Sequence, residues 1–254
     1  MAKRSPATPA PSVRPPPSDS PSEALPKNLL LATLPRADFE RLRPHLKTVA
    51  FRPRQVLHKQ GGLIEHVYFP NGGVYSITTM LSTGAMVEAA TVGDEGMLGF
   101  ETFLTADAVS PGETLMQVPD TSAEMLSVAE FRNELANGGA LRELMGRYTQ
   151  VVIAQMMQSS ACNALHHVEQ RCARWLLMTH DRMHEQDFTL SHEFLAVMLG
   201  VQRPTVTVVA GTLQEAGLIR YTHGRVTVLN RAGLEGAACE CYPIIRAHFN
   251  RLRR

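Results

Sequence analysis

Residues 189–229 constrain the fold of this chain more than any other segment. They predict two short helices around a tight turn, followed by a two-stranded hairpin, and read TLSHEFLAVMLGVQRPTVTVVAGTLQEAGLIRYTHGRVTVL. Ser191 can cap the first helix, because its side-chain oxygen can accept a hydrogen bond from an otherwise unpaired backbone N–H. Gly200 supplies the turn, and Pro204 falls in the first turn of the second helix, where its missing N–H costs little. The segment therefore predicts a helix-turn-helix unit with a wing.

The second helix of this unit has one apolar face and one face free to contact a partner. Val206, Val209 and Leu213 recur at helical spacing and predict the inner stripe. A helix whose outer face enters the major groove of DNA reads base edges with its side chains. The candidates for base contacts are Arg203, Thr207, Val208, Gln202 and Pro204. The segment is interpreted as a DNA-reading element, and the alternative is a small helical subdomain that packs on a neighbour.

The hairpin turns at His223-Gly224 and carries several basic side chains. Cations beside a reading helix can contact phosphates, which fixes the register on the duplex without reading its sequence. The candidates for phosphate contacts are Arg220, His223, Arg225, Ser191 and Thr205.

The net charge of +1 conceals an asymmetry between the two halves of the chain. Residues 168–254 hold 11 Arg and no Lys against 8 acidic residues, a net charge of +3. Residues 28–140 hold 8 basic and 13 acidic residues, a net charge of −5. The basic half contains the predicted DNA-reading unit, as electrostatic docking to phosphate requires.

The chain resembles the Crp/Fnr family, named after the cyclic-AMP receptor protein and the fumarate–nitrate regulator, over about residues 28–245. The resemblance rests on the winged unit, a preceding β-rich segment punctuated by glycines, and a long helix between the two. It implies a homodimer in which an N-terminal β-roll senses a signal, a central helix dimerises, and the C-terminal domains bind a two-fold symmetric DNA site. RNA polymerase is a further candidate partner.

The expected fold class is α+β, with a β-roll of the cyclic-nucleotide-binding type, a long dimerisation helix and a C-terminal winged helix-turn-helix domain. Short runs rich in Val, Ile, Thr and Tyr predict the strands of the roll near 47–52, 55–58, 64–69, 73–81, 85–91, 113–119 and 124–128. The first 27 residues hold 8 of the 16 prolines and predict a tail without a core. The expected divisions are a tail over 1–27, the roll over 28–139, the helix over 140–166, the DNA-binding domain over 167–245 and a basic tail over 246–254.

The helix expected over 140–166 would extend roughly 40 Å at 1.5 Å per residue. That is longer than packing on a small domain requires, so dimer formation is favoured over packing within its own domain. The side chains near one seam, predicted to form the dimer interface, are Leu141, Leu144, Met145, Tyr148, Val152, Met156 and Ser159.

The effector site of the family is degenerate in this sequence. Members that bind cyclic nucleotides use a Gly-Glu pair for the ribose and an Arg-Ser pair for the cyclic phosphate, whereas here Phe100 follows Gly99 and VSPGETLMQV contains no Arg. From 60 to 131 there is no Lys or Arg in 72 residues, while 10 are acidic. A buried phosphate there would have only backbone N–H groups or the partner's helix to neutralise it, and an unpaired buried anion is costly. The degenerate pocket is assigned to Gly99, Phe100, Glu101 and Ser110, with no cyclic AMP bound through the usual contacts, no cofactor and the effector unknown.

The cysteines and histidines leave an alternative open. No cysteine precedes Cys162, which does not fit the N-terminal iron–sulfur sites of the family, and the four cysteines are expected to be reduced thiols. Cys162, His166 and His167 lie on the long helix, with Cys162 and His166 one turn apart, and Cys239-Glu240-Cys241 lies near the C-terminus, so a metal or haem site could be assembled from such groups. Without a C-x-x-C pair, packing is favoured and no metal is predicted. The alternative function is a ligand, metal or haem sensor that does not bind DNA.

An enzyme is not expected. The chain contains no G-x-x-x-x-G-K-[ST], G-x-S-x-G or H-E-x-x-H pattern. No apolar run approaches the roughly 18–20 residues of a membrane span, and the N-terminus has no apolar signal segment. A cytoplasmic protein without a membrane partner is expected.

Overall fold

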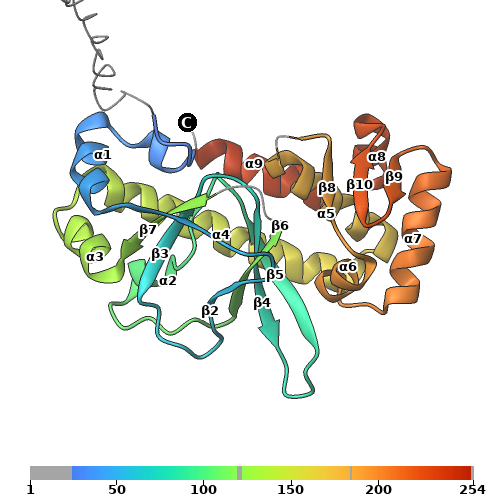
Figure 1. Cartoon of the computed structure of the whole chain (residues 1–254), viewed down its shortest axis with the longest axis horizontal. Helices are drawn as coiled ribbons and strands as arrows, with labels where there is room; N and C mark the ends of the chain where they lie inside the picture. Colours follow the sequence, from blue (N-terminus) through green and yellow to red (C-terminus); the bar gives the residue numbers. More distant parts are fainter. Residues whose placement is uncertain (1–24, 119–121, 184, 253–254) are drawn as a thin grey trace, which may run out of the picture.

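The computed structural model describes residues 25–118, 122–183 and 185–252 (Figure 1). The predicted tail lies outside the described residues up to residue 24. The described chain begins with short helical segments: η1 (Leu31–Thr33), α1 (Arg36–Leu42) and η2 (Arg43–His45). Buried Asn28 anchors this entry, because its side-chain amide donates to the Pro70 carbonyl at 2.7 Å and to the Gly96 carbonyl at 2.9 Å.

Seven strands and two helices follow, close to the predicted positions. They are β1 (Lys47–Ala50), β2 (Val56–His58), β3 (His66–Pro70), β4 (Val74–Met80), β5 (Met86–Val92), α2 (Glu101–Leu104), β6 (Glu113–Val118), β7 (Ser122–Ser127) and α3 (Val128–Ala136). The strands form two antiparallel sheets of order β1-β7-β3 and β2-β6-β4-β5. The sheets enclose a core of large apolar side chains, among them Phe69, Tyr75 and Met97.

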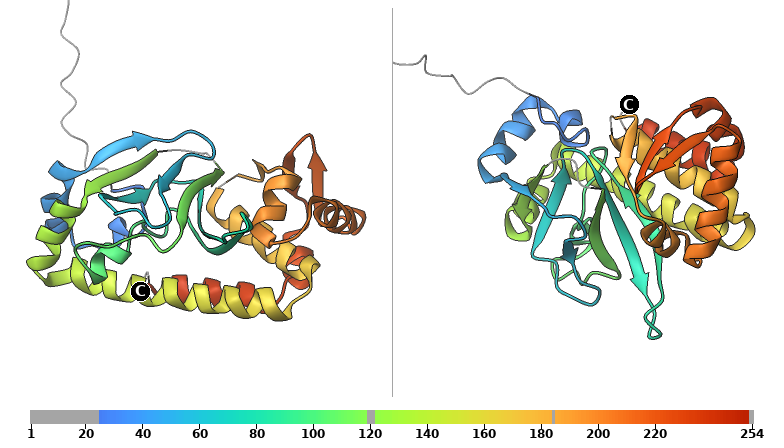
Figure 2. Two further views of the ribbon diagram at one scale, coloured as in Figure 1. Left: turned by 90° about the horizontal axis from the view of Figure 1, so that it is seen from below. Right: turned by 45° about the vertical axis from the view of Figure 1, so that its right-hand side comes forward.

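The long helix α4 (Gly139–Leu165) runs beneath the roll (Figure 2). Its 27 residues match the predicted length, but the seam predicted as the dimer interface faces the same chain. Tyr148, for example, is fully buried, and its hydroxyl donates to the Met97 carbonyl at 2.8 Å. Most residues of the predicted dimer interface are buried within their own chain, and Met156 is partly buried. The buried residues are Leu141, Leu144, Met145, Tyr148, Val152 and Ser159. Packing of α4 on its own domain therefore uses the face that the sequence analysis gave to the partner subunit.

After a sharp turn at His166 and His167, α5 (Val168–Met183) leads into the C-terminal domain. This domain contains β8 (Asp187–Thr189), α6 (His192–Leu199), α7 (Arg203–Glu215), β9 (Ile219–Thr222), β10 (Arg225–Val228), α8 (Arg231–Ala237) and α9 (Cys241–Leu252). Its sheet has the order β8-β10-β9, so the predicted hairpin gains a third strand that the sequence analysis missed.

The local signals of the winged unit act as predicted. The Ser191 hydroxyl accepts from the Phe194 N–H at 3.2 Å at the start of α6, and Gly200 ends that helix in the left-handed region at φ 62°. The wing turns at His223 and Gly224, with φ of 50° and 78°. Positive φ at both central residues is the geometry of a two-residue turn whose twist matches the flanking strands.

The prediction of a separate basic tail over 246–254 is wrong for the described residues 246–252. Residues up to Leu252 continue α9, which lies alongside α4 (Figure 2). The reason is apolar periodicity: Ile245, Phe249 and Leu252 form a buried stripe, while the arginines between them face outward.

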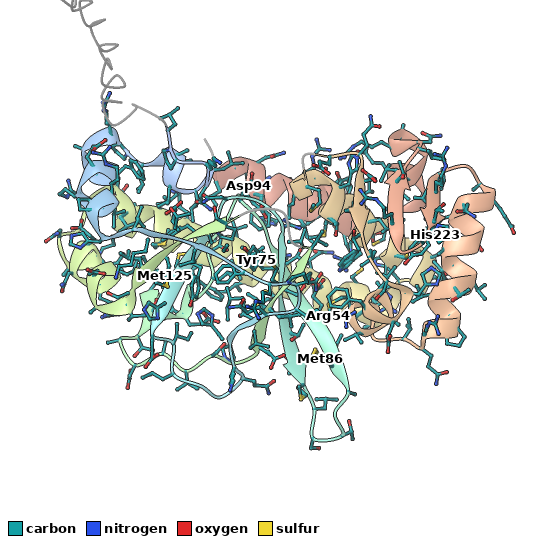
Figure 3. All side chains as sticks on the ribbon, viewed as in Figure 1. Arg54, Tyr75, Met86, Asp94, Met125 and His223 are labelled. Carbon is teal, nitrogen blue, oxygen red and sulfur yellow. The ribbon has the colours of Figure 1, made fainter. Side chains whose placement is uncertain are left out.

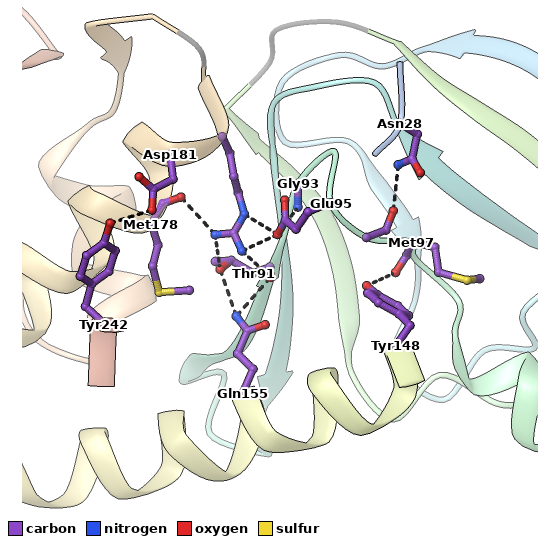
Figure 4. A network of polar contacts seen from close by, with 12 residues as sticks. Asn28, Thr91, Gly93, Glu95, Met97, Tyr148, Gln155, Met178, Asp181 and Tyr242 are labelled. Atoms are coloured by element: carbon purple, nitrogen blue, oxygen red, sulfur yellow. Dashed lines mark hydrogen bonds and ion pairs between the residues drawn. The ribbon is translucent and has the colours of Figure 1, made fainter. Parts of the chain in front are cut away.

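Helix α5 joins the two halves through buried polar contacts (Figure 4). The Arg182 guanidinium pairs with Glu95 of the roll at 2.6 Å and donates to the Thr91 hydroxyl at 2.9 Å. About two turns earlier on α5 than Arg182, the Trp175 indole N–H donates to the Glu88 carboxylate at 3.1 Å. Burial raises the pKa of Glu88 above its usual range, against the opposing effect of its hydrogen bonds.

A second contact seats the helix-turn-helix on the roll. The Arg54 guanidinium lies over the Phe194 ring, 5.8 Å from its centroid, where the roll meets α6 (Figure 3). Within the described ranges, no single helix is long and apolar enough to cross a membrane. The pair α6 and α7 passes that test only jointly, with a bend of 104° between the two helices.

Candidate nucleic-acid interface

Helix α7 forms an outer edge of the molecule, away from the roll (Figure 1). Its inner stripe is buried as predicted: Val206, Val209 and Leu213 are 0–4% exposed. Arg203, at the first position of the helix, is exposed, and Val208 is 69% exposed. An apolar side chain left so open in the middle of a helix covers nothing within its own chain.

The hydroxyl of Thr207 is already occupied within the chain. It donates to the Arg203 carbonyl at 3.2 Å and lies 3.0 Å from the His192 Nδ1. His192 can donate from Nδ1 in the corresponding tautomer. Both polar functions of the hydroxyl are then engaged, which leaves the Thr207 methyl group as the part available to a partner.

The remaining predicted base contacts lie at the start of α7. Gln202 is the exposed N-cap residue and Pro204 is exposed in the first turn. The structure thus brings the predicted base contacts together on one exposed surface: Gln202, Arg203, Pro204, Thr207 and Val208.

Some of the predicted phosphate-contacting side chains are exposed on the wing, and others already bond within the chain. Arg220 and His223 are exposed on the wing, with His223 at its tip (Figure 3). Arg225 is paired with Asp187 of β8, with Nη2 2.6 Å and Nε 2.8 Å from the carboxylate. Ser191 uses its hydroxyl as the α6 cap, and Thr205 is half-buried in the first turn of α7. The strand missed by the sequence analysis thus supplies an internal anion for one predicted phosphate ligand.

The positions of the degenerate effector pocket are filled by the roll itself. Gly99 has φ +83°, and a Cβ there would lie 3.2 Å from His58 and from Ile64. Phe100 is 5% exposed and packs edge-on against Tyr148, with ring centroids 6.5 Å apart.

The two polar residues of the predicted pocket are Ser110 and Glu101. The buried Ser110 hydroxyl donates to the Gly112 carbonyl at 2.7 Å. Burial raises the pKa of Glu101 above its usual range. These contacts support the prediction that the family's nucleotide contacts are absent here.

The roll does receive a cation, from a source that the sequence analysis did not consider. Arg182 enters from α5, but its charge is neutralised by Glu95. Beside this pair lies a cavity of about 250 Å³, between the end of β5, α5 and α9. It is lined by acidic, basic and apolar groups, including Asp181, Arg246 and Phe249.

The structure brings together the cysteines and the histidine that the sequence analysis considered as an alternative metal or haem site. Four side chains from distant segments converge: Cys162, His166, Cys239 and Cys241. Two sequence patterns could have indicated metal ligands: Cys-x-x-x-His at the end of α4 and Cys-x-Cys at the start of α9. Neither pattern shows that the two segments lie side by side. No disulfide joins the four cysteines, as expected.

Comparison with known proteins supports the DNA-binding assignment. Residues 170–237 match the family model of the Crp-like helix-turn-helix domain. That match spans α5 to α8, including the candidate base and phosphate contacts. No curated protein sequence matches the chain.

Solved structures share the fold at low sequence identity. FixK2 from Bradyrhizobium japonicum matches with a TM-score of 0.64 and 16% identity, covering 76% of this chain and 98% of FixK2. A Crp/Fnr family regulator from Eubacterium rectale has the same TM-score and identity, covering 82% and 96%. CLP from Xanthomonas campestris, a c-di-GMP responsive global regulator, matches with a TM-score of 0.61 and 17% identity, covering 76% and 99%.

The α+β fold predicted from the sequence is thus confirmed, and the predicted winged unit lies within the matched helix-turn-helix domain. Residues 170–237 thus match a Crp-like helix-turn-helix domain, in a chain whose fold is similar to that of FixK2 and of a Crp/Fnr family regulator.

Proposed function

We propose that this chain is a transcription regulator, which binds DNA as a homodimer and reads an inverted repeat through the exposed face of α7. The observation that carries the proposal is the exposure of two side chains on a helix whose opposite face is buried. Arg203 is exposed, and Val208 is 69% exposed. Such a helix presents one cation, at its first turn, and apolar or methyl groups one turn later. That is the chemistry of direct readout in the major groove.

The half-site follows from these side chains. Arg203 is the one cation on the face of α7, and bidentate contact from Arg to guanine O6 and N7 is the commonest specific contact. Val208 and the free methyl of Thr207 suit thymine methyl groups. We expect a half-site with one dominant G and adjacent T positions.

Dimerisation is assigned to the face of α4 that its own chain leaves open. Ile153 is 48% exposed and Met157 is 70% exposed, one turn apart. Apolar groups at such spacing on a long helix form a seam with a second helix. Two-fold symmetry then places the half-sites about one helical turn, ~34 Å, apart.

The effector is proposed not to be cyclic AMP bound through the usual family contacts. Phe100 stands at the position of the ribose ligand, and Arg182, a buried guanidinium that reaches the roll, is already paired with Glu95. Titration calorimetry of the purified protein should give no tight cyclic-AMP binding. As a regulator of this type it is expected in the cytoplasm, with RNA polymerase as a further partner.

Selection from a random DNA pool, at one stated salt concentration and without added ligand, tests the reading face. The wild-type protein should enrich an inverted repeat, and Arg203→Ala should lose about 1–3 kcal/mol and the preference at the G. Arg246→Ala is the matched control, because it removes an exposed cation from α9, away from α7. If Arg203→Ala selects the same G as the wild-type protein, the assignment of Arg203 is wrong.

Sedimentation velocity tests the dimer face separately. Met157→Glu should shift the dimer toward monomer and weaken binding to the full repeat, since a charge would be buried at the seam. Leu81→Glu is the control, because Leu81 is also exposed, at 58%, but lies in the β4–β5 hairpin. A dimer that survives Met157→Glu unchanged would place the interface elsewhere.

A further inference from the structure

Two segments far apart in the sequence meet at the joint between the long helix and the DNA-binding domain. Cys162 and His166 occupy the last turn of α4 and the residue after it. Cys239 and Cys241 lie in the short connection from α8 to α9 and at the start of α9. One ligand atom from each of the four side chains lies within 4.8 Å of all the others.

The four groups form a compact and nearly closed set. The Cys162 and Cys239 sulfurs are 3.5 Å apart, and the Cys241 sulfur is 3.4 Å from the His166 Nδ1. The three cysteines are 0–2% exposed, and the His166 side chain is 19% exposed.

We propose that Cys162, His166, Cys239 and Cys241 bind a single Zn²⁺ ion as a structural Cys₃His site. Zinc takes four tetrahedral ligands at about 2.3 Å to sulfur and 2.0–2.1 Å to nitrogen. Tetrahedral geometry at those lengths separates the ligand atoms by roughly 3.5–3.8 Å. The 3.5 Å and 3.4 Å separations lie within a few tenths of an ångström of these values, and the other ligand atoms lie within 4.8 Å of one another, so the ion requires only side-chain adjustments.

The surrounding side chains have the roles expected around such an ion. The His166 Nε2 lies 3.1 Å from the Glu240 carboxylate, which favours the tautomer with the proton on Nε2. The lone pair on Nδ1, toward Cys241, is then free to bind metal. The Gln158 amide donates to the Cys241 sulfur at 3.1 Å, a contact that stabilises a thiolate.

Other chemistries fit the arrangement less well. A Cys162–Cys239 disulfide would need the sulfurs about 2.05 Å apart, and it would leave Cys241 and His166 without a function. An iron–sulfur cluster spreads its ligands over several metal atoms, whereas these ligand atoms all lie within 4.8 Å. Three thiolates with one imidazole favour zinc over the harder cations, which prefer oxygen.

The position of the site gives the ion a role. It would tie the start of α9 to the end of α4, at the turn from which α5 leaves for the DNA-binding domain. All four ligand positions come from the protein, which is typical of structural and not catalytic zinc. The ion would therefore hold the DNA-binding domain in a fixed orientation on the long helix.

Metal analysis of the full chain, purified under reducing conditions without an affinity tag, tests the proposal. We expect about one Zn²⁺ per chain in the wild-type protein and in Cys172→Ser, and its loss in Cys239→Ser. Cys172 is the matched control because it is a fully buried cysteine on α5 outside the group. Circular dichroism identifies any variant that fails to fold.

Cobalt titration keeps the test valid if Cys239→Ser does not fold. The reduced, zinc-stripped wild-type protein should bind one Co²⁺ with the absorption of a tetrahedral thiolate site, and Zn²⁺ should displace it. Glu240→Gln, which leaves all four ligands in place, should weaken metal affinity about 10–100-fold.

Three results would overturn the site. The first is a reduced wild-type protein that takes up neither Zn²⁺ nor Co²⁺, and the second is undiminished zinc in a folded Cys239→Ser. The third is a protein isolated with a Cys162–Cys239 disulfide whose reduced form binds no metal, shown by differential alkylation and mass spectrometry. None of these readouts depends on DNA binding, so failure of the zinc site leaves the proposed reading of DNA untouched.

Discussion

The β-roll and the winged domain use their polar groups in opposite ways. In the roll, the positions of the family's effector site are filled by Phe100 and by packing around Gly99. In the winged domain, Arg203 and Arg220 are left exposed on the outer surface. This contrast between a filled interior and exposed cations underlies the proposals that the roll lacks the family's usual nucleotide contacts and that α7 reads DNA.

Helix α5 connects the two regions at their joint and buries polar groups of both. Helix α5 belongs to the matched DNA-binding domain, yet its Arg182 and Trp175 are buried against Glu95 and Glu88 of the roll. Removing one member of such a pair is costly, because it leaves the other charge buried without a partner. The comparison therefore predicts different responses to substitution in the roll, the joint and the wing.

The largest effect is expected at the joint. Arg182→Met should lower the free energy of unfolding by about 3–5 kcal/mol, because it leaves the Glu95 carboxylate buried without its partner. The double variant Arg182→Met with Glu95→Gln should recover most of that loss. Urea unfolding measures both, and a loss below about 1 kcal/mol for Arg182→Met would show that the pair does not hold the domains together.

The next effect tests how tightly the roll is filled. Gly99 and Gly84 have nearly equal φ, +83° and +82°, but a Cβ meets His58 and Ile64 only at Gly99. Each change to Ala should cost about 1–2 kcal/mol for the left-handed backbone. Gly99→Ala should cost roughly 1–3 kcal/mol more, from overpacking. Equal losses of unfolding free energy for Gly99→Ala and Gly84→Ala in chemical denaturation would mean that the space around Gly99 accommodates a methyl group.

A smaller, pH-dependent effect should come from the roll interior. Burial lowers the pKa of His58, whose Nε2 lies 2.9 Å from the His66 carbonyl. Above the unfolded pKa of about 6.5 both states are neutral, and below it only the unfolded chain takes up the proton. The contribution of His58 to stability is therefore lost as the pH falls below about 6.5.

His58→Gln keeps a donor for the His66 carbonyl and removes this titration. Its unfolding free energy should fall less steeply than that of the wild-type protein between about pH 7 and pH 5. His167→Gln, at an exposed position, serves as the control and should follow the wild-type curve. Parallel curves for His58→Gln and the wild-type protein would contradict the burial argument.

The smallest effect is expected on the wing, where an exposed ion pair competes with DNA. Arg225→Ala should weaken binding to all sequences alike and reduce the slope of log affinity against log salt by about 1. Asp187→Asn should have the opposite effect, since it releases Arg225 from its 2.6 Å contact. Exposed pairs are worth about 0–1 kcal/mol, so a few-fold gain in affinity at low salt is expected. Weaker binding by Asp187→Asn would show that the pair orders the wing for DNA.

Much of the architecture could be predicted because the signals are local. Alternating strand patterns gave the seven strands of the roll within a few residues, and Ser191 and Gly200 marked the two ends of α6. The two-residue turn at His223-Gly224 depends only on backbone preferences at adjacent positions. Periodicity likewise separated the buried and open faces of α7, because a helix with one covered side must place its apolar groups every three or four residues.

The same reasoning failed where a residue's partner lies far along the chain. Periodicity found the apolar seam of α4 but could not tell whether the roll or a second subunit covers it. The Arg182–Glu95 pair spans 87 positions and the Cys162–Cys239 contact spans 77.

The sequence by itself determined the elements, the winged reading unit and the contrast between a basic and an acidic half. Only the tertiary structure decided which face of α4 is free, which cation enters the roll, and that three cysteines and a histidine meet at the joint. The physical reason is that backbone preferences and amphipathic patterns act over a few residues. Pairing of buried charges and gathering of metal ligands depend instead on how whole elements pack.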